Sequence, residues 1–177
     1  MSANWYKEQP KNRNFLNPIG YLLKLELFSG TDFFCQSVNL PDINMPVTEV
    51  PSRFRSLPIL PGGGVTFGDL NVRFIVDEDL NNYNSIHSWI RRNGRADEDE
   101  NTPEFPEFSN AQLHIVTSQY NPAFIIDYRN IFPVSLTDLR FDATMTDVDY
   151  ITADVVFKHQ QFFILDKNNK PLWILIT

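Results

Sequence analysis

The sequence predicts a mainly β protein: an antiparallel β-barrel or sandwich with one flanking α-helix and a long, proline-rich loop. Several segments alternate apolar and polar side chains with a period of two, which is typical of a half-buried strand. One segment has helical spacing, and prolines crowd one stretch, residues 41–64. With 177 residues, 42% of them apolar and 14% aromatic, the chain can close one core, so we expect one domain over residues 19–165.

The first strand should follow a polar arm. Residues 1–18 are rich in Asn, Lys and Arg and are interrupted by prolines, so we expect an N-terminal arm without a core of its own. Tyr21, Leu23 and Leu25 then alternate with mostly polar neighbours, which predicts a strand over residues 21–28. Turn residues at 29–32 precede a returning strand over residues 33–40.

Residues 41–64 hold five prolines and end in three consecutive glycines. Because proline lacks a backbone donor, this segment cannot form a central strand, and we predict a long, extended loop. Its apolar side chains beside arginines are typical of a protein interface, although such a loop can also fold back on its own barrel. The candidate contacts with another subunit are Pro41, Val50, Arg53, Phe54, Arg55, Leu57 and Ile59.

A strand over residues 70–76 should lead into a helix over residues 80–93. The acids at 77–79 suit a helix N-terminus, and Tyr83, Ile86 and Ile90 have helical spacing. Arginines at 91 and 92 and a glycine at 94 suit a helix C-terminus.

The second half of the chain predicts further strands. Residues 95–110 are acidic and polar and should form a solvated loop. Strands are then expected near residues 113–117, 123–128 and 134–141, the last with a bulge, and a long strand begins near Tyr150 with alternate residues 151–157 on one face. In the C-terminal extension 166–177, residues 172–176 are apolar on both faces, so Leu172, Trp173 and Ile174 should dock on the barrel or on a neighbouring subunit.

No motif indicates catalysis. His87 is expected on the helix surface and His114 and His159 on polar strand faces, and no two of them have ligand spacing. The glycine run lacks the Lys-Ser/Thr of a phosphate-binding loop, and the acidic runs lack calcium-loop spacing. The single cysteine, Cys35, has no base near it in sequence and suggests a buried thiol. We therefore predict no enzyme, no metal and no cofactor.

The net charge and the lengths of the apolar segments exclude other classes of protein. The net charge of -7 argues against a protein that binds nucleic acid by neutralising phosphates. The N-terminus has no apolar signal region and no apolar run is long enough to span a bilayer, so we expect neither export nor a membrane partner.

The order of these elements, together with several short motifs, resembles the tail tube family of contractile phage tails. The motifs are Leu40-Pro41, Arg53 in the extended segment, residues 66–70 (TFGDL), residues 74–78 (FIVDE), Tyr83, Ile86 and Trp89 in the helix, residues 130–136 (NIFPVSL) and residues 149–153 (DYITA). The resemblance covers residues 17–165 and includes the tubes of type VI secretion systems and extracellular injection machines.

The resemblance implies a structural virion protein of the tail, assembled in the host cytoplasm. Copies would form hexameric rings that stack into the inner tube, with sheath, baseplate or tail-terminator proteins as partners. DNA would pass through the lumen during ejection without specific binding. Strand residues that alternate in charge are the candidates for the lumen wall: Lys24, Glu26, Asp69, Asn71, Arg73 and Asp154.

Two alternatives remain at this point. The segments 1–18 and 166–177 exceed a minimal tube subunit, which would suit a baseplate tube-initiator or a hub-adaptor ring of the same tail. A more distant alternative is a monomeric β-barrel that binds a ligand or peptide with its proline-rich loop.

Overall fold

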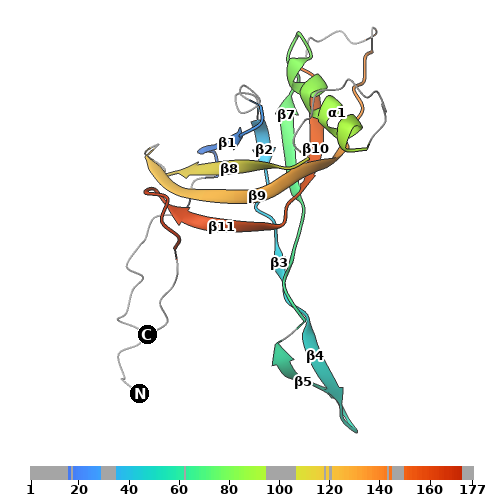
Figure 1. Ribbon diagram of the computed structural model, residues 1–177, viewed down its shortest axis with the longest axis vertical. Coiled ribbons are helices and arrows are strands. Elements are labelled where there is room, and N and C mark those ends of the chain that lie inside the picture. The colour runs from blue at the N-terminus through green and yellow to red at the C-terminus, as the bar shows by residue number, and fades with distance from the viewer. Residues whose placement is uncertain are drawn as a thin grey trace.

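The computed structural model describes residues 16, 18–28, 35–61, 63–94, 107–117, 119, 121–142, 144 and 150–172, and it confirms the predicted class of antiparallel β-structure with a flanking helix (Figure 1). The elements of the described chain are β1 (Tyr21–Leu25), β2 (Cys35–Val38), β3 (Ile43–Asn44), β4 (Val47–Pro51), β5 (Ser56–Pro61), β6 (Thr66–Phe67), β7 (Leu70–Ile75), α1 (Asn81–Asn93), β8 (Ser109–Val116), β9 (Pro122–Leu136), β10 (Thr152–Lys158) and β11 (Gln161–Asp166).

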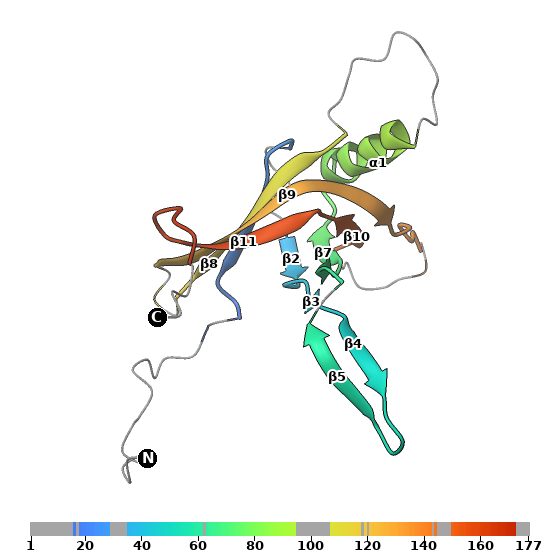
Figure 2. The same cartoon turned by 60° about the horizontal axis from the view of Figure 1, so that its bottom comes forward.

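The body is a seven-stranded sheet in the order β1-β8-β9-β10-β7-β2, with β11 also paired to β9. The N-terminal part of β9 lies between β8 and β11, whereas its C-terminal part pairs with β10. We call β1, β8, β9 and β11 the first half-sheet, and β9, β10, β7 and β2 the second half-sheet. They cross at a steep angle in Figure 1, and β9 curves from one into the other in Figure 2. The described strands form a sandwich-like body and no closed barrel.

The bend in β9 follows from two irregularities. Asn130 has a φ of 53°, in the left-handed region that asparagine tolerates, and the pairing with β8 shifts by one residue there. A second extra residue, Val134, bulges out where β9 pairs with β10, inside the segment where the sequence predicts a bulge. The two strands expected at 123–128 and 134–141 are therefore one bent strand that ends at Leu136.

The core lies between the two half-sheets and the helix. The alternation predicted for the first and last strands is confirmed, since Leu23, Leu25, Val155 and their counterparts are buried. The fully buried ring of Trp89 attaches α1 to this core. Its ring centroid lies 5.6 Å from that of Phe28 and 6.2 Å from that of Phe157. Buried core residues are Leu23, Leu25, Leu70, Val72, Phe74, Ile86, Trp89, Ala111, Leu113, Ile126, Tyr128, Ile131, Ala153, Val155 and Phe157.

The ends of α1 differ in detail from the sequence prediction. The helix begins at Asn81, and its first turn holds no acidic residue because residues 77–79 form the preceding turn. The Asn82 side chain secures that turn: its Oδ1 accepts from the Asp77 N–H at 3.2 Å and its Nδ2 donates to the Ile75 carbonyl at 2.9 Å. At the other end Gly94 has a φ of -81°, so the cap does not use the left-handed conformation that favours glycine.

The first two strands do not pair with each other as a hairpin. The strand that returns after β1 does not pair with it: β1 pairs with β8, and β2 pairs with β7. The two strands lie at opposite ends of the strand order, and the Tyr21 hydroxyl donates a hydrogen bond to the Gln36 carbonyl between them. In place of the single long strand expected from residue 150, the structure has two strands, β10 and β11, because the chain turns at His159 and Gln160.

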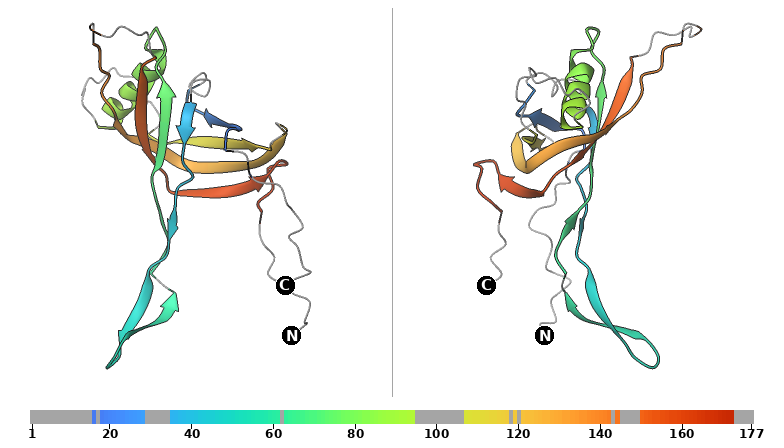
Figure 3. Two further views of the ribbon diagram at one scale, coloured as in Figure 1. Left: turned by 180° about the vertical axis from the view of Figure 1, so that it is seen from behind. Right: turned by 45° about the vertical axis from the view of Figure 1, so that its right-hand side comes forward.

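The proline-rich segment is a structured arm rather than an irregular loop. Its root pairs β3 with β6 and its outer part pairs β4 with β5, and Figures 1 and 3 show it projecting from the body. A two-stranded ladder tolerates prolines because each strand has one unpaired edge, where a missing N–H costs nothing. Gly63 and Gly64, with φ of 95° and 96°, turn the chain between β5 and β6 in a conformation that requires glycine. We call residues 43–67 the arm.

Three predictions lie largely outside the described residues: the N-terminal arm 1–18, most of the loop 95–110, and the C-terminal extension beyond Leu172. Within the described part of the chain, no helix is long and apolar enough to cross a membrane.

Candidate assembly surfaces

Four of the six candidate lumen residues gather on one surface. Asn71 and Arg73 lie in β7, and Asp69 immediately precedes it, so the three have alternate spacing. Asp154 lies opposite Arg73 on β10. They cover the face of the second half-sheet that points away from the core, and we call this face the polar wall. Lys24 and Glu26 lie in or beside β1, in the first half-sheet, so the structure separates them from the other four.

The charges on the polar wall are paired. Arg73 Nε lies 2.7 Å from Asp154 Oδ1, and the second nitrogen of the guanidinium lies 2.8 Å from Oδ2. Hydrogen bonding to Arg73 lowers the pKa of Asp154. Lys158 Nζ lies 2.5 Å from Asp69 Oδ1. Two acids and two bases therefore cancel over the described wall. Lys158 was missing from the predicted set, although its even spacing from Asp154 indicated the same face.

The second half-sheet has two unpaired edges in the described structure. β2 pairs with β7 on one side only, and the last residues of β9 pair with β10 on one side only. Unpaired strand edges present backbone N–H and C=O groups that another strand can satisfy. On β2, Gln36 is a bulged residue that has no partner on β7.

The arm presents apolar side chains to solvent. Phe54 at the tip is 90% exposed, and the Arg53 guanidinium lies 5.5 Å from its ring centroid. Val50 and Leu57 are also exposed, at 45% and 37%. The structure thus brings most of the predicted contact residues together on one projection. Arg55 is exposed there too, and Ile59 lies in β5, although its side chain is outside the described part.

The root of the arm is fixed to β7. Gly68 N–H donates to the Asp42 carbonyl at 2.9 Å. The Asn39 amide donates to the Asp69 carbonyl at 3.0 Å and accepts from the Asn71 N–H at 2.6 Å. Pro41, another predicted contact with a neighbouring subunit, is buried beside these hydrogen bonds and does not lie on the exposed part of the arm.

The C-terminal candidates are only partly described. Leu172 is 50% exposed, and its N–H donates to the Ile164 carbonyl at 3.1 Å. Together with Phe162, Phe163 and Pro171 these residues line a shallow apolar depression of about 240 Å³. Trp173 and Ile174 lie outside the described residues.

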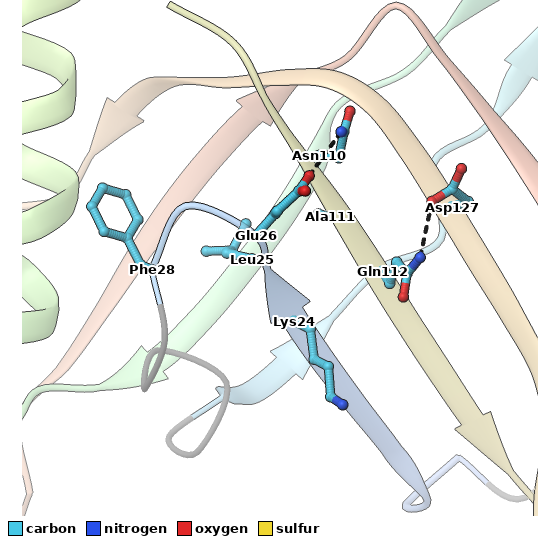
Figure 4. Close-up of a pocket in the computed structure, with 8 residues that line it drawn as sticks. All are labelled: Lys24, Leu25, Glu26, Phe28, Asn110, Ala111, Gln112 and Asp127. Carbon is cyan, nitrogen blue, oxygen red and sulfur yellow. Dashed lines mark hydrogen bonds between the residues drawn. The ribbon is translucent and has the colours of Figure 1, made fainter. Parts of the chain in front are cut away.

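A second depression, of about 560 Å³, lies beside β1 (Figure 4). Its two carboxylates are hydrogen-bonded within the chain: Asn110 Nδ2 donates to Glu26 Oε2 at 2.8 Å, and Gln112 Nε2 donates to Asp127 Oδ1 at 3.3 Å. Because neighbouring amides hold these oxygens, the described lining residues present no converging set of unpaired carboxylates that would orient a ligand.

The histidines and the cysteine do not form a reactive group in the described structure. His87 is exposed on α1, as predicted, and His114 lies in β8. His159 is not on a polar strand face. It stacks on Tyr128 with ring centroids 5.3 Å apart and contacts Phe67 at 5.8 Å, because the turn after β10 packs against the arm root. Burial lowers the pKa of His159 and raises that of the half-buried Cys35 to about 11. No three potential ligands converge as a metal site among the described residues.

Solved structures share this fold. The chain matches a chain in the anti-feeding prophage tube-terminating cap with a TM-score of 0.63 at 14% identity, covering 92% of this chain and 98% of the other. It matches one in the extended sheath–tube complex of the PVC extracellular contractile injection system with a TM-score of 0.60 at 15% identity, covering 87% and 93%. For Hcp1 from Flavobacterium johnsoniae the TM-score is 0.50 at 10% identity, covering 82% and 94%.

No family model and no curated protein matches the sequence itself. The neighbours in structure are nevertheless tube and terminator components of contractile injection systems together with Hcp proteins, as the sequence resemblance indicates. The chain therefore has the fold of the proteins that build such tubes.

Proposed function

We propose that this chain is a structural ring subunit of the inner tube of a contractile, phage-type tail. The observation that carries the proposal is the second half-sheet, which has two unpaired edges and one polar face whose charges cancel. A sheet of this kind can continue into a neighbouring copy at both edges.

Pairing β2 of one copy with the end of β9 in the next is a heterologous contact. Such a contact closes into a ring when the rotation between copies divides a full turn. The shared fold and the sequence resemblance both favour a ring, and the hexameric state follows from the resemblance alone. In the ring the second half-sheets form one continuous inner wall.

The polar wall then lines the lumen. Its described acids and bases cancel in pairs, so a passing polyanion meets no net charge that would hold it. We propose DNA as the cargo on this basis, in line with the resemblance to phage tails. Lys24 and Glu26 lie in the other half-sheet, and we assign them to the outer wall, which faces the sheath.

The arm provides the contact between rings. It projects beyond the body, and its exposed Val50, Phe54 and Leu57 give it apolar side chains to bury. Prolines within β5 and at the end of β4 remove backbone donors from the arm, which disfavours pairing with a further strand, so we assign its binding to the side chains.

A specialised ring at one end of the tube is the second candidate. It is favoured because a tube-terminating cap and a baseplate structure both contain chains of this fold. An initiator, adaptor or terminator subunit would form a single ring in each particle, whereas the repeating subunit would form many stacked rings.

The edge of β2 provides the test. Gln36→Pro removes an N–H from a residue that has no ladder partner on β7, so the subunit should still fold. Gln36→Ala is the matched control, because it loses the same side-chain contact with Tyr150 and keeps the N–H. We expect rings from the alanine variant and monomers from the proline variant by light scattering. Equal assembly of both variants would contradict pairing at this edge.

A further inference from the structure

The arm and the turn before α1 lie at opposite ends of the second half-sheet. The arm connects the end of β2 to the start of β7, and residues 77–80 follow the end of β7. β7 has six residues, so the sheet separates the two features by about 20 Å at the usual strand rise. Figures 1 and 3 show the arm and α1 pointing to opposite ends of the molecule.

The tip of the arm is basic and apolar. Its turn is closed by hydrogen bonds from the backbone and side chain of Ser52 to the Arg55 carbonyl, at 3.0 Å and 2.6 Å. This turn displays Arg53, Phe54 and Arg55 together at the far end of the molecule. The acid nearest to the tip, Glu49, accepts a hydrogen bond from Ser56 at 2.6 Å. The tip therefore carries two positive charges around one exposed aromatic ring.

The opposite end is acidic and apolar. Asp77, Glu78 and Asp79 follow Val76, the first residue after β7, and Leu80 beside them is 41% exposed. Tyr150, 58% exposed, is adjacent, because Val76 N–H donates to the Ile151 carbonyl at 2.8 Å. We call residues 77–80 with Tyr150 the acidic end.

Other charged residues near the acidic end make its net charge more negative. The Tyr83 hydroxyl donates to the Thr137 carbonyl at 3.0 Å, which brings the segment after β9 to the first turns of α1. This segment contains Asp138, Arg140 and Asp142, of which Arg140 and Asp138 pair at 3.5 Å. Residues 77–79 and this segment together contain five acids and one base.

We propose that the acidic end of one copy receives the arm tip of a second copy in the adjacent ring. The inference rests on the proposed tube function and names the surface that the arm binds. Arg53 and Arg55 face Glu78 and Asp79, while Phe54 packs against Leu80 and Tyr150. From its root at Asp42 to its tip the arm can reach about 35 Å when extended, which is longer than the roughly 20 Å that the sheet spans along β7.

The contact sets the direction of the tube. Because its two sides are different surfaces at opposite ends of one chain, it does not close on itself and repeats without limit. All rings then point the same way. Opposite charges on the two surfaces also disfavour stacking of like ends, since two arm tips or two acidic ends repel each other.

A charge swap tests the proposal in assemblies grown from the full chain, alone or on a baseplate. Arg53→Glu with Arg55→Glu should weaken ring stacking at least tenfold and leave single rings in electron micrographs. Glu78→Lys with Asp79→Lys should do the same, and a chain with all four changes should stack again. Arg53→Lys with Arg55→Lys is the matched control, which keeps the charge and should stack like the wild type.

The outcomes separate the two proposals. Normal stacking of both reversed variants, or no recovery in the fourfold variant, would overturn the arm contact while rings persist. Wild-type chain that forms no ring would overturn the tube function and the contact together. Circular dichroism and thermal unfolding of each variant establish that a loss of stacking is not a loss of folding.

Discussion

Arg73 and Asp154 face each other across β7 and β10 and form two hydrogen bonds, Nε to Oδ1 at 2.7 Å and the second nitrogen to Oδ2 at 2.8 Å. The paired geometry holds both side chains on the polar wall, and it neutralises a charge of each sign there. The fold of the second half-sheet creates this pair, because the two residues are far apart in sequence but opposite in register.

This pair predicts a specific response to acid. Hydrogen bonding to Arg73 lowers the pKa of Asp154 in the folded state, so its stabilising effect is complete above about pH 4 and is lost as the pH falls through the lower folded value. Asp154→Asn should therefore lose less stability between pH 5 and pH 2 than the wild type, by urea unfolding. Asp138→Asn, from a longer and more exposed pair, is the control for the removal of one surface carboxylate.

The attachment of the helix gives a second prediction. Trp89 is fully buried between Phe28 and Phe157, so Trp89→Ala should lower the free energy of unfolding by about 3–5 kcal/mol. His87→Ala changes an exposed residue on the same helix and should stay within about 0.5 kcal/mol of the wild type. A small effect of Trp89→Ala in chemical denaturation would mean that α1 is not part of the core.

His159 gives a third prediction, at milder pH. Because burial lowers its pKa, the unfolded chain binds the proton more readily, and stability falls as the pH drops below the ordinary histidine value of about 6.5. His159→Phe keeps an aromatic ring against Tyr128 and cannot titrate. Its unfolding midpoint should change less between pH 8 and pH 5 than that of the wild type. The remaining dependence should come from His114, whose pKa is lowered in the same direction, chiefly by burial.

The single thiol reports on folding and assembly. The pKa of Cys35 is raised from 9.0 to about 11, a difference of about two, so the thiolate is roughly 100-fold scarcer at neutral pH than in an unperturbed thiol. Ellman's reagent should react at least that much more slowly with folded chain than with chain in urea. If β2 pairs in the ring, the rate should fall again on assembly. Equal rates in rings and monomers would argue against burial of this edge.

Local patterns predicted the elements better than their partners. The period-two alternation around Leu23 and Val155, and the helical spacing around Ile86, report only which face of an element is buried, and the structure agrees with each. Pairing of β1 with β8 joins residues far apart in sequence, and no local pattern encodes that choice. The arm is regular although its prolines predict an irregular loop, because proline is excluded from central strands, whereas both strands of a two-stranded hairpin are edges.

The candidate surfaces, too, could be predicted only as far as local sequence patterns allow. The exposed residues of the arm tip, such as Arg53 and Phe54, were recognisable from composition alone. The polar wall was only partly recognisable, since alternation placed Asp69 and Asp154 on strand faces but could not show that Lys158 and Arg73 neutralise them. Lys24 has the same alternation, yet it lies in the other half-sheet because of a long-range pairing.

Negative-stain electron microscopy of the purified chain, with its mass measured by light scattering, tests the central claim most directly. A tube subunit should give hollow rings or stacked tubes, either alone or when a baseplate is supplied as a template. Long tubes would identify the repeating subunit, and isolated rings would favour a specialised one. A chain that stays monomeric under every templating condition would contradict the tube assignment and favour a monomeric binding module.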